Sequence, residues 1–166
     1  MRSLFFIAFL ISIGGLRAQS DSVAYDQMLK EYYTYSVPLM QPAALYKRLM
    51  NGEKIHLLDA RESSEYEISA LKGAVNVGFL LFNKNRVDTF KKSDLIVVYC
   101  TIGARSETIG EKLIKAGYSN VYNLYGGIIY WKNKGFPVYH NNQQTEEVHV
   151  YSKKWGVWLT NGKARY

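Results

Sequence analysis

Short apolar runs alternate with amphipathic stretches along most of the chain. The apolar runs predict strands at residues 55–59, 73–77, 95–99 and 121–124. Apolar positions three or four residues apart predict helices at residues 42–50, 62–69, 107–116 and 128–133. This alternation is typical of an α/β fold, in which a central, mainly parallel sheet is covered by helices on both faces.

Both ends of the chain depart from this alternation. Before it, residues 21–32 predict a short helix and residues 32–37 predict a short strand or extended segment. After it, residues 141–147 read as a polar linker that leads into an aromatic tail. Within the tail, Asn161-Gly162 predicts a hairpin turn between residues 158–160 and 163–166. We expect the tail to pack on the domain, with partner binding by its aromatic side chains as the alternative.

The first residues have the pattern of a secretory signal peptide. Met1-Arg2 is basic, residues 4–13 are almost entirely apolar, and Leu16-Arg17-Ala18 precedes a predicted cleavage after Ala18. The apolar run is short for a membrane span, so we expect residues 1–18 to be removed and the mature chain to have no span. The predicted location is therefore periplasmic or secreted. An uncleaved membrane anchor is the alternative.

Composition favours one folded domain with short extensions. The chain has 166 residues, of which 48% are hydrophobic and 21% charged. Its net charge of +7 falls to +5 if the signal segment, with Arg2 and Arg17, is removed. The basic residues are scattered and form no continuous stripe, so the sequence does not favour nucleic-acid binding.

The main candidate for chemistry is Cys100, the single cysteine of the chain. It follows the strand at 95–99 and precedes a turn and a helix, a place where open α/β sheets bind ligands. A helix N-terminus and a nearby arginine both favour the thiolate form of a cysteine. We therefore predict Cys100 as a nucleophile. A buried, inert cysteine is the alternative. The predicted binding residues, through backbone N–H groups and one guanidinium, are Thr101, Ile102, Gly103, Ala104, Arg105 and Ser106.

Other kinds of site are less favoured by the sequence. The three histidines, His56, His140 and His149, are far apart and none pairs with a cysteine at metal-binding spacing, so we expect no metal. Gly126-Gly127 lacks the rest of a dinucleotide-binding motif and is predicted to be a turn, so we expect no organic cofactor. Asp59, Glu62 and Glu65 follow the first core strand and are predicted to cap and support.

Several motifs in order resemble the rhodanese-like domain of the sulfurtransferase family. They are Leu57-Leu58-Asp59-Ala60-Arg61 with Glu65-Tyr66, Leu71-Lys72-Gly73-Ala74-Val75-Asn76, the Cys100 loop, Gly117-Tyr118, Leu124-Tyr125-Gly126-Gly127, Trp131 and Gly135-Phe136-Pro137-Val138. The resemblance suggests an N-terminal extension at 19–36, a rhodanese-like domain at 37–139, and a linker with an aromatic extension at 140–166. One departure is Ser69-Ala70, where the family often has Gly-His.

The resemblance implies a three-layer α/β sandwich and a persulfide on Cys100. It implies transfer of a sulfane sulfur from a donor such as thiosulfate or a persulfide to a thiol, to cyanide or to a protein acceptor. Asp59 and Arg61 would support the active loop. Related phosphatases have a longer loop than the four residues between Cys100 and Arg105, which favours a single sulfur atom over a phosphoryl group. A non-enzymatic persulfide carrier, or a redox-sensing or partner-binding module, remains the alternative.

Overall fold

The computed structural model describes residues 23–166, so the predicted signal segment at 1–18 lies outside the described residues. The chain forms two compact units, one ending at Glu31 and one spanning Tyr32–Tyr166. In the first unit residues 23–30 are helical, within the predicted range. The aromatic C-terminal segment belongs to the second unit, together with the sheet. No helix in the described part of the chain has both the length and the apolar composition that a membrane crossing requires.

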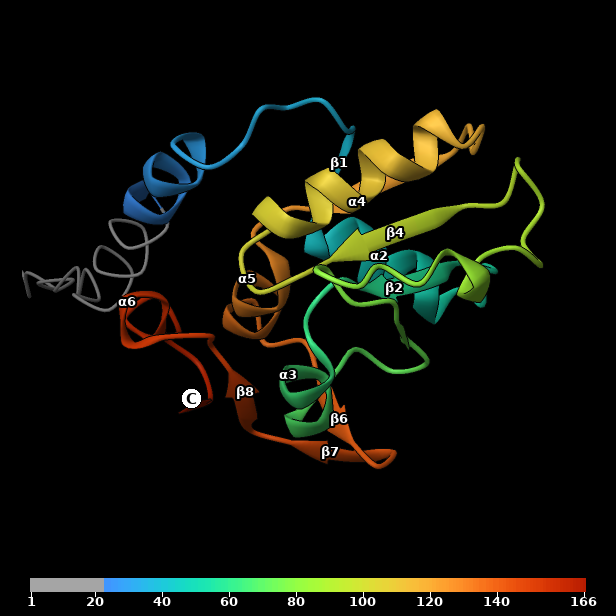
Figure 1. The fold of residues 1–166 in the computed structure, drawn as a ribbon. Coiled ribbons are helices and arrows are strands. Elements are labelled where there is room, and N and C mark those ends of the chain that lie inside the picture. Colours follow the sequence, from blue (N-terminus) through green and yellow to red (C-terminus); the bar gives the residue numbers. More distant parts are fainter. Residues whose placement is uncertain (1–22) are drawn as a thin grey trace, which may run out of the picture. The chain divides into compact units, whose positions relative to one another are not determined.

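A five-stranded sheet lies at the centre of the second unit (Figure 1). Its strands are β1 (Leu39–Met40), β2 (His56–Asp59), β3 (Val75–Asn76), β4 (Ile96–Tyr99) and β5 (Val121–Leu124). The spatial order is β1-β5-β4-β2-β3 and every pairing is parallel. All four residues of the central strand β4 are buried, because both faces of a parallel sheet are covered. The predicted α/β class is confirmed.

Helices lie against both faces of this sheet (Figure 1). The helical elements between β1 and β6 are α2 (Pro42–Met50), α3 (Ser63–Ile68), the 3₁₀ turn η1 (Lys84–Arg86), α4 (Ala104–Lys115) and α5 (Gly127–Asn133). Ile109 and Leu113 of α4 are buried in the main core with Leu58 and Val98 of the sheet. Ala116, the last residue of the predicted range 107–116, lies just beyond the end of α4 and is exposed.

Of the two alternatives predicted for the aromatic segment at 32–37, a strand or an extended segment, the structure shows the extended one. Its backbone donors bond to a side chain instead, because the carboxylate of Glu107 in α4 accepts from the N–H groups of Thr34 and Ser36, both at 2.9 Å. Tyr35 has a φ of +58°, which no strand adopts. The segment is therefore extended and fixed to α4, and the first strand of the sheet comes later, at β1.

The hairpin predicted at Asn161-Gly162 is wrong. β8 (Glu147–His149) and β9 (Lys163–Arg165) pair in parallel, and their connection contains the helix α6 (Lys153–Gly156). The backbone N–H groups of Thr160 and Asn161 donate to Oδ1 of Asn133, at the end of α5, at 2.8 and 3.2 Å. These donors are thus used by another element and are not available for a hairpin.

A hairpin occurs instead where a polar linker was predicted. β6 (Val138–His140) and β7 (Gln143–Thr145) are antiparallel, and the two turn residues Asn141 and Asn142 have φ values of +47° and +65°. A two-residue turn with both φ values positive matches the twist of paired strands, and asparagine tolerates that conformation. Ala70 and Tyr139 exchange backbone hydrogen bonds at 2.8 and 2.9 Å, which fasten the hairpin to the segment after α3.

Candidate active site

Cys100 lies directly after β4, at the carboxyl end of the sheet, and is 1% exposed. The chain turns at Gly103, which has a φ of +108°, and α4 begins at the next residue. The N–H of Gly103 points back and donates to Sγ of Cys100 at 3.2 Å. A backbone donor on the sulfur, close to the positive end of α4, favours negative charge at that atom.

Tyr33 fixes this loop through two hydrogen bonds of its hydroxyl group. Its hydroxyl donates to the carbonyl of Ile102 at 2.6 Å and accepts from the N–H of Gly126 at 2.9 Å. Burial raises the pKa of Tyr33, so its hydroxyl stays protonated and keeps donating. A Cβ at position 103 would lie 1.8 Å from the tyrosine oxygen, so only glycine fits there. Sequence reasoning missed Tyr33, because no local pattern links it to a loop so far along the chain.

The guanidinium of Arg105 is paired with a buried carboxylate. Its Nη1 and Nη2 each donate to an oxygen of Glu65 at 2.7 Å, and Nη2 also donates to Oγ1 of Thr101 at 2.9 Å. The Thr101 hydroxyl in turn donates to Glu65 at 3.2 Å. Burial alone would raise the pKa of the Glu65 carboxyl, but the hydrogen bonds and charge of Arg105 outweigh it and hold this pKa below its ordinary value. The positive charge of Arg105 is therefore already compensated.

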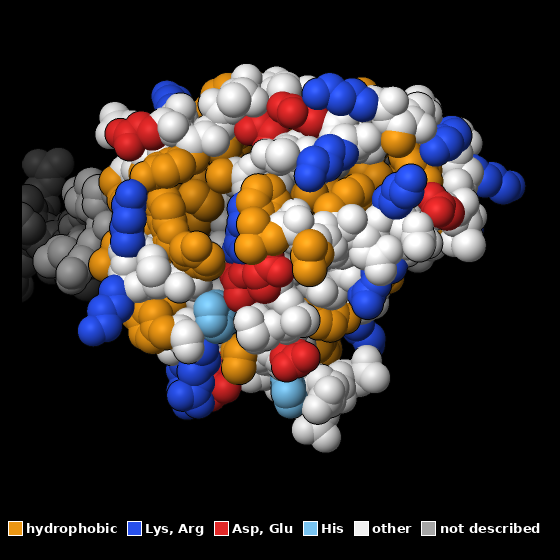
Figure 2. Space-filling model, viewed as in Figure 1, with side chains coloured by type: hydrophobic (Ala, Val, Ile, Leu, Met, Phe, Trp, Pro, Cys, Tyr) orange, Lys and Arg blue, Asp and Glu red, His pale blue; other side chains and the backbone are white. Residues whose placement is uncertain are grey.

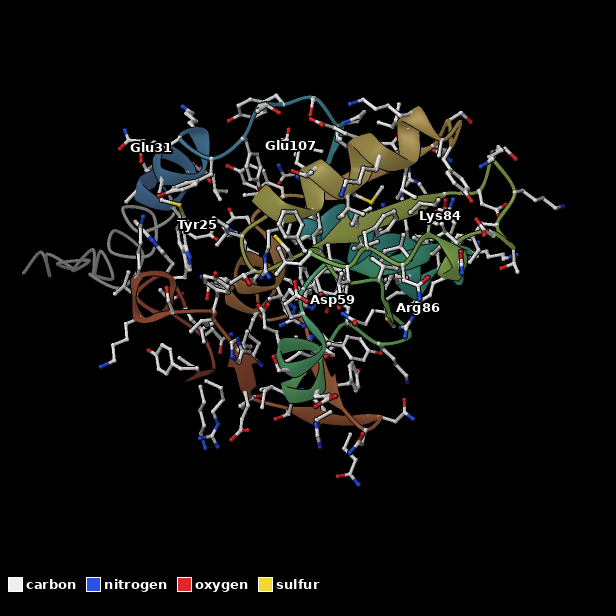
Figure 3. The ribbon with its side chains drawn as sticks, viewed as in Figure 1. Tyr25, Glu31, Asp59, Lys84, Arg86 and Glu107 are labelled. Carbon is white, nitrogen blue, oxygen red and sulfur yellow. The ribbon has the colours of Figure 1, made fainter. Side chains whose placement is uncertain are left out.

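The capping predicted for the acidic residues after β2 is observed, whereas support of the active loop by Asp59 and Arg61 stays a prediction. Glu62 and Glu65 form a capping box at the start of α3. Asp59, at the end of β2 (Figure 3), is fully buried with Arg61, whose Nη2 lies 2.7 Å from Oδ2 of the carboxylate. Arg61 also donates to the carbonyl of Ser69 at 2.6 Å. The Asp59–Arg61 pair thus ties the strand next to β4 to the end of α3.

Ser106 supports the loop from the helix side. It is fully buried, and its hydroxyl lies 2.7 Å from Oδ1 of Asn123 and 3.0 Å from the carbonyl of Gly103. The side-chain amide of Asn123, in β5, donates to the same carbonyl at 2.9 Å. The Ser106 side chain therefore braces the turn and is not part of the cavity wall.

A cavity of about 430 Å³ has Cys100 among its lining residues. Its lining consists of Cys100, Thr101, Ile102, Ala104 and Arg105 from the loop, Glu62, Phe79 and Leu80 from segments after β2 and β3, and Tyr32, Tyr151 and Trp155 from the two ends of the unit. Figure 2 shows hydrophobic side chains gathered on this face near the start of α4, with charged side chains beside them. Most of the predicted loop residues therefore meet in one cavity. Among the described residues no cluster of side chains could hold a metal ion.

Three aromatic side chains, Tyr32, Tyr151 and Trp155, form what we call the aromatic wall of this cavity. The rings of Tyr32 and Trp155 meet edge to face with centroids 5.0 Å apart, and Nζ of Lys154 donates to the Tyr32 hydroxyl at 2.7 Å. The guanidinium of Arg105 lies 5.1 Å from the centroid of the Tyr151 ring. The aromatic content of the tail was a signal in the sequence, but its position beside Cys100 could not be read from it.

The family description "Rhodanese-like domain" matches residues 42–134, more than half of the chain. The chain therefore belongs to the rhodanese-like family. A protein named sulfurtransferase from Allochromatium vinosum is 34% identical over 95 residues, which cover 57% of this chain and 88% of that protein. A tRNA uridine(34) hydroxylase from Pelagibacter ubique is 35% identical over 91 residues, but the match covers 53% of this chain and only 30% of the hydroxylase.

Solved structures agree with this assignment. The solution structure of a rhodanese-like domain from an Anabaena protein has a TM-score of 0.58 and 25% identity to this chain. The superposition covers 78% of this chain and 89% of that domain. The predicted family and sandwich fold are thus confirmed. All three residues of the aromatic wall lie outside the matched residues 42–134.

Proposed function

We propose that this protein is a sulfurtransferase that moves a sulfane sulfur through a persulfide on Cys100. The observation that carries the proposal is the place of this thiol. It lines a cavity, at the end of the central strand of a rhodanese-like fold, with a backbone N–H on its sulfur. The name of the Allochromatium vinosum relative supports the same class of chemistry.

The reaction consists of two displacements at sulfur. In the first, the Cys100 thiolate attacks the sulfane sulfur of the donor, the donor's S–S bond breaks, and the leaving group keeps the bonding electron pair. In the second, a thiolate or cyanide attacks the outer sulfur of the persulfide and Cys100 leaves as a thiolate. No electrons pass to or from the protein, so neither a metal nor an organic cofactor is required. Thr101, Ile102, Gly103, Ala104 and Arg105 surround the transferred sulfur, and Ser106 fixes the loop.

Mass spectrometry of the intact mature protein tests this proposal. We expect the wild type to gain the mass of one sulfur atom after incubation with thiosulfate or a small organic persulfide, and to lose it on addition of cyanide or a thiol. A Cys100→Ser variant should gain nothing. If the wild type gains no sulfur from any sulfane donor, the sulfurtransferase proposal is wrong.

A persulfide carrier is the second candidate, and the burial of Cys100 favours it. A thiol that is 1% exposed would shelter a bound sulfur from solvent and from bulky acceptors. A carrier would hold the persulfide in the presence of cyanide and small thiols and release it only to a specific partner. Repeated turnover with cyanide would identify an enzyme instead.

Export is a further part of the proposal, supported by the sequence of residues 1–18. We propose a periplasmic or secreted location for the mature chain. Expression of the full chain in a Gram-negative host, followed by N-terminal sequencing of the periplasmic fraction, should give a mature protein that begins at Gln19. Retention of the full-length chain in the cytoplasm would contradict it.

A further inference from the structure

The charges around the cavity are poorly matched to an inorganic dianion. The cation of the loop, Arg105, is bonded through both terminal nitrogens to Glu65, which is 3% exposed. The second charged residue in the lining, Glu62, is acidic and would repel a dianion. No other charged side chain belongs to the described lining of this cavity. Among the lining residues, thiosulfate would therefore meet one acidic group and one cation that is already paired with Glu65.

The lining is instead mostly apolar. Phe79, Leu80 and Ile102 form one part of it, and the aromatic wall forms the other. Leu80 is 80% exposed, although leucine is usually buried. Binding is favoured when an apolar group of a ligand covers an exposed apolar side chain of this kind, because apolar surface is removed from water.

The volume of the cavity also favours an organic donor over thiosulfate. Its volume of about 430 Å³ is within the usual range of about 300–1,000 Å³ for pockets that enclose small organic ligands. Thiosulfate would fill only a small part of this space and leave the aromatic rings in contact with water. A donor with an aromatic or aliphatic group next to its sulfur would fill the cavity and still place that sulfur at Cys100.

The aromatic wall is an addition to the family core. The matched residues 42–134 contain Cys100 and its loop, whereas Tyr32 precedes this range and Tyr151 and Trp155 follow it. The two ends of the unit are joined over the cavity by the ring contact of Tyr32 with Trp155 and by the hydrogen bond from Lys154 to Tyr32. Segments outside the matched residues 42–134 thus add apolar surface to the cavity that Cys100 lines.

We infer that the cavity selects an organic persulfide with an aromatic or aliphatic substituent as its sulfur donor, in preference to thiosulfate. The inference rests on the proposed sulfurtransferase function and specifies its substrate class. The Cys100 thiolate attacks the outer sulfur of the donor R–S–SH, and the S–S bond breaks. The organic thiolate leaves with the bonding electron pair and takes up the proton, while the outer sulfur stays on Cys100. The step needs no oxidant or reductant.

Steady-state kinetics with three donors test the inference, with cyanide as acceptor throughout. Benzyl persulfide supplies an aromatic group, 2-hydroxyethyl persulfide has the same reactive sulfurs with a small polar group, and thiosulfate is the inorganic dianion. We expect kcat/KM to be highest for benzyl persulfide, and about tenfold higher than for the hydroxyethyl compound, a discrimination of the size that apolar pockets provide.

Variants of the wall separate binding in the cavity from intrinsic donor reactivity. Trp155→Ala should reduce the benzyl-to-hydroxyethyl ratio of kcat/KM several-fold. Trp158→Ala is the matched control, because it removes the same ring from the same tail but outside the lining, and should keep the ratio. Tyr151→Ala provides a second test if Trp155→Ala does not fold, because Tyr151 is 59% exposed.

The outcomes distinguish this inference from the proposed function. Equal efficiency with both persulfides, a preference for thiosulfate, or an unchanged ratio in both wall variants would overturn the donor class. In each of these cases Cys100 would still be loaded with sulfur, and the sulfurtransferase proposal would stand. If no donor loads Cys100, both proposals are wrong.

Discussion

At the scale of single residues, Glu65 connects more parts of the site than any motif suggests. Its carboxylate accepts hydrogen bonds from Arg105 and Thr101 in the loop and from the backbone N–H of Glu62 at the start of α3. His149, from the C-terminal segment, lies 3.8 Å away, and burial is the main reason that the pKa of this histidine is lowered. One buried carboxylate thus fixes the active loop to α3 and compensates its cation.

We predict that Glu65→Gln destabilises the protein by about 2–3 kcal/mol at neutral pH, because Arg105 would lose its charged partner. This is below the cost for a fully buried pair, since the Arg105 side chain is 19% exposed. Urea unfolding of the two proteins measures the difference. Glu67→Gln is the control, because Glu67 is exposed on the same helix and its replacement should have little effect.

The same pair predicts a pH dependence. Because the pKa of Glu65 is lowered in the folded state, its contribution is complete above the ordinary glutamate pKa of about 4.3. It is lost as the pH falls from there through the lowered pKa. The stability difference between wild type and Glu65→Gln should therefore shrink across that acidic range. A difference that stays constant from neutral pH into this range would contradict the assignment.

At the scale of elements, the regular part of the fold could be predicted because periodicity in the sequence reports burial. Pro42–Met50 and Val121–Leu124 agree with their predicted ranges, and β4 is the central strand. Two segments were decided by distant side chains. The backbone donors at Thr34 and Ser36 bond to Glu107, and those at Thr160 and Asn161 bond to Asn133. The hairpin of β6 and β7, predicted as a linker, has a local cause in the positive φ values of Asn141 and Asn142.

We predict that Glu107→Ala releases the segment before β1 from α4. Glu107, labelled on α4 in Figure 3, is the acceptor for two backbone N–H groups of that segment. Its loss should cost about 1–3 kcal/mol and speed the hydrogen exchange of the Thr34 and Ser36 amides. Glu111→Ala is the control, since Glu111 accepts from the Ser36 side chain, and it should leave the Thr34 amide protected. Equal exchange in both variants would disprove the role of Glu107.

The residues of the candidate site also fall into two groups, those that the sequence predicts and those that it does not. Cys100 and its loop could be found from sequence, because the strand, the thiol, the glycine and the arginine all lie within residues 95–105. Tyr33, Glu65 and the aromatic wall could not, because their relation to the loop exists only after folding. The role of Arg105 toward a donor stays a prediction, since the structure adds a partner for its charge that the loop sequence does not reveal.

At the scale of the whole unit, the C-terminal segment is packed against the family core. Asn133, the last residue of α5, donates to the carbonyl of Trp158 at 2.7 Å and accepts from two backbone N–H groups beyond it. Lys132, buried, forms an ion pair with Glu146 at 2.8 Å. These contacts hold the segment that contains Tyr151 and Trp155, so the shape of the cavity depends on the end of α5.

We predict that Asn133→Ala loosens this segment and makes Cys100 more accessible. Three backbone groups would lose their partner, and hydrogen exchange at Thr160 and Asn161 should become faster. Alkylation of Cys100 by iodoacetamide should also become faster, because Tyr151 and Trp155 of the aromatic wall belong to the same segment. Asn133→Asp, which keeps the acceptor oxygen, should show smaller effects. If alkylation is unchanged in Asn133→Ala, the wall does not control access to the thiol.

The depth of Cys100 has a consequence for oxidation. The sequence contains no second cysteine, so a sulfenic acid formed on this sulfur has no internal thiol with which to condense. Two folded copies are not expected to join through it either, because Cys100 is 1% exposed and a disulfide bond requires two sulfur atoms roughly 2 Å apart. We therefore expect no disulfide-linked dimers of the folded protein under oxidising conditions, and we expect that only a thiol small enough to enter the cavity can reduce an oxidised Cys100.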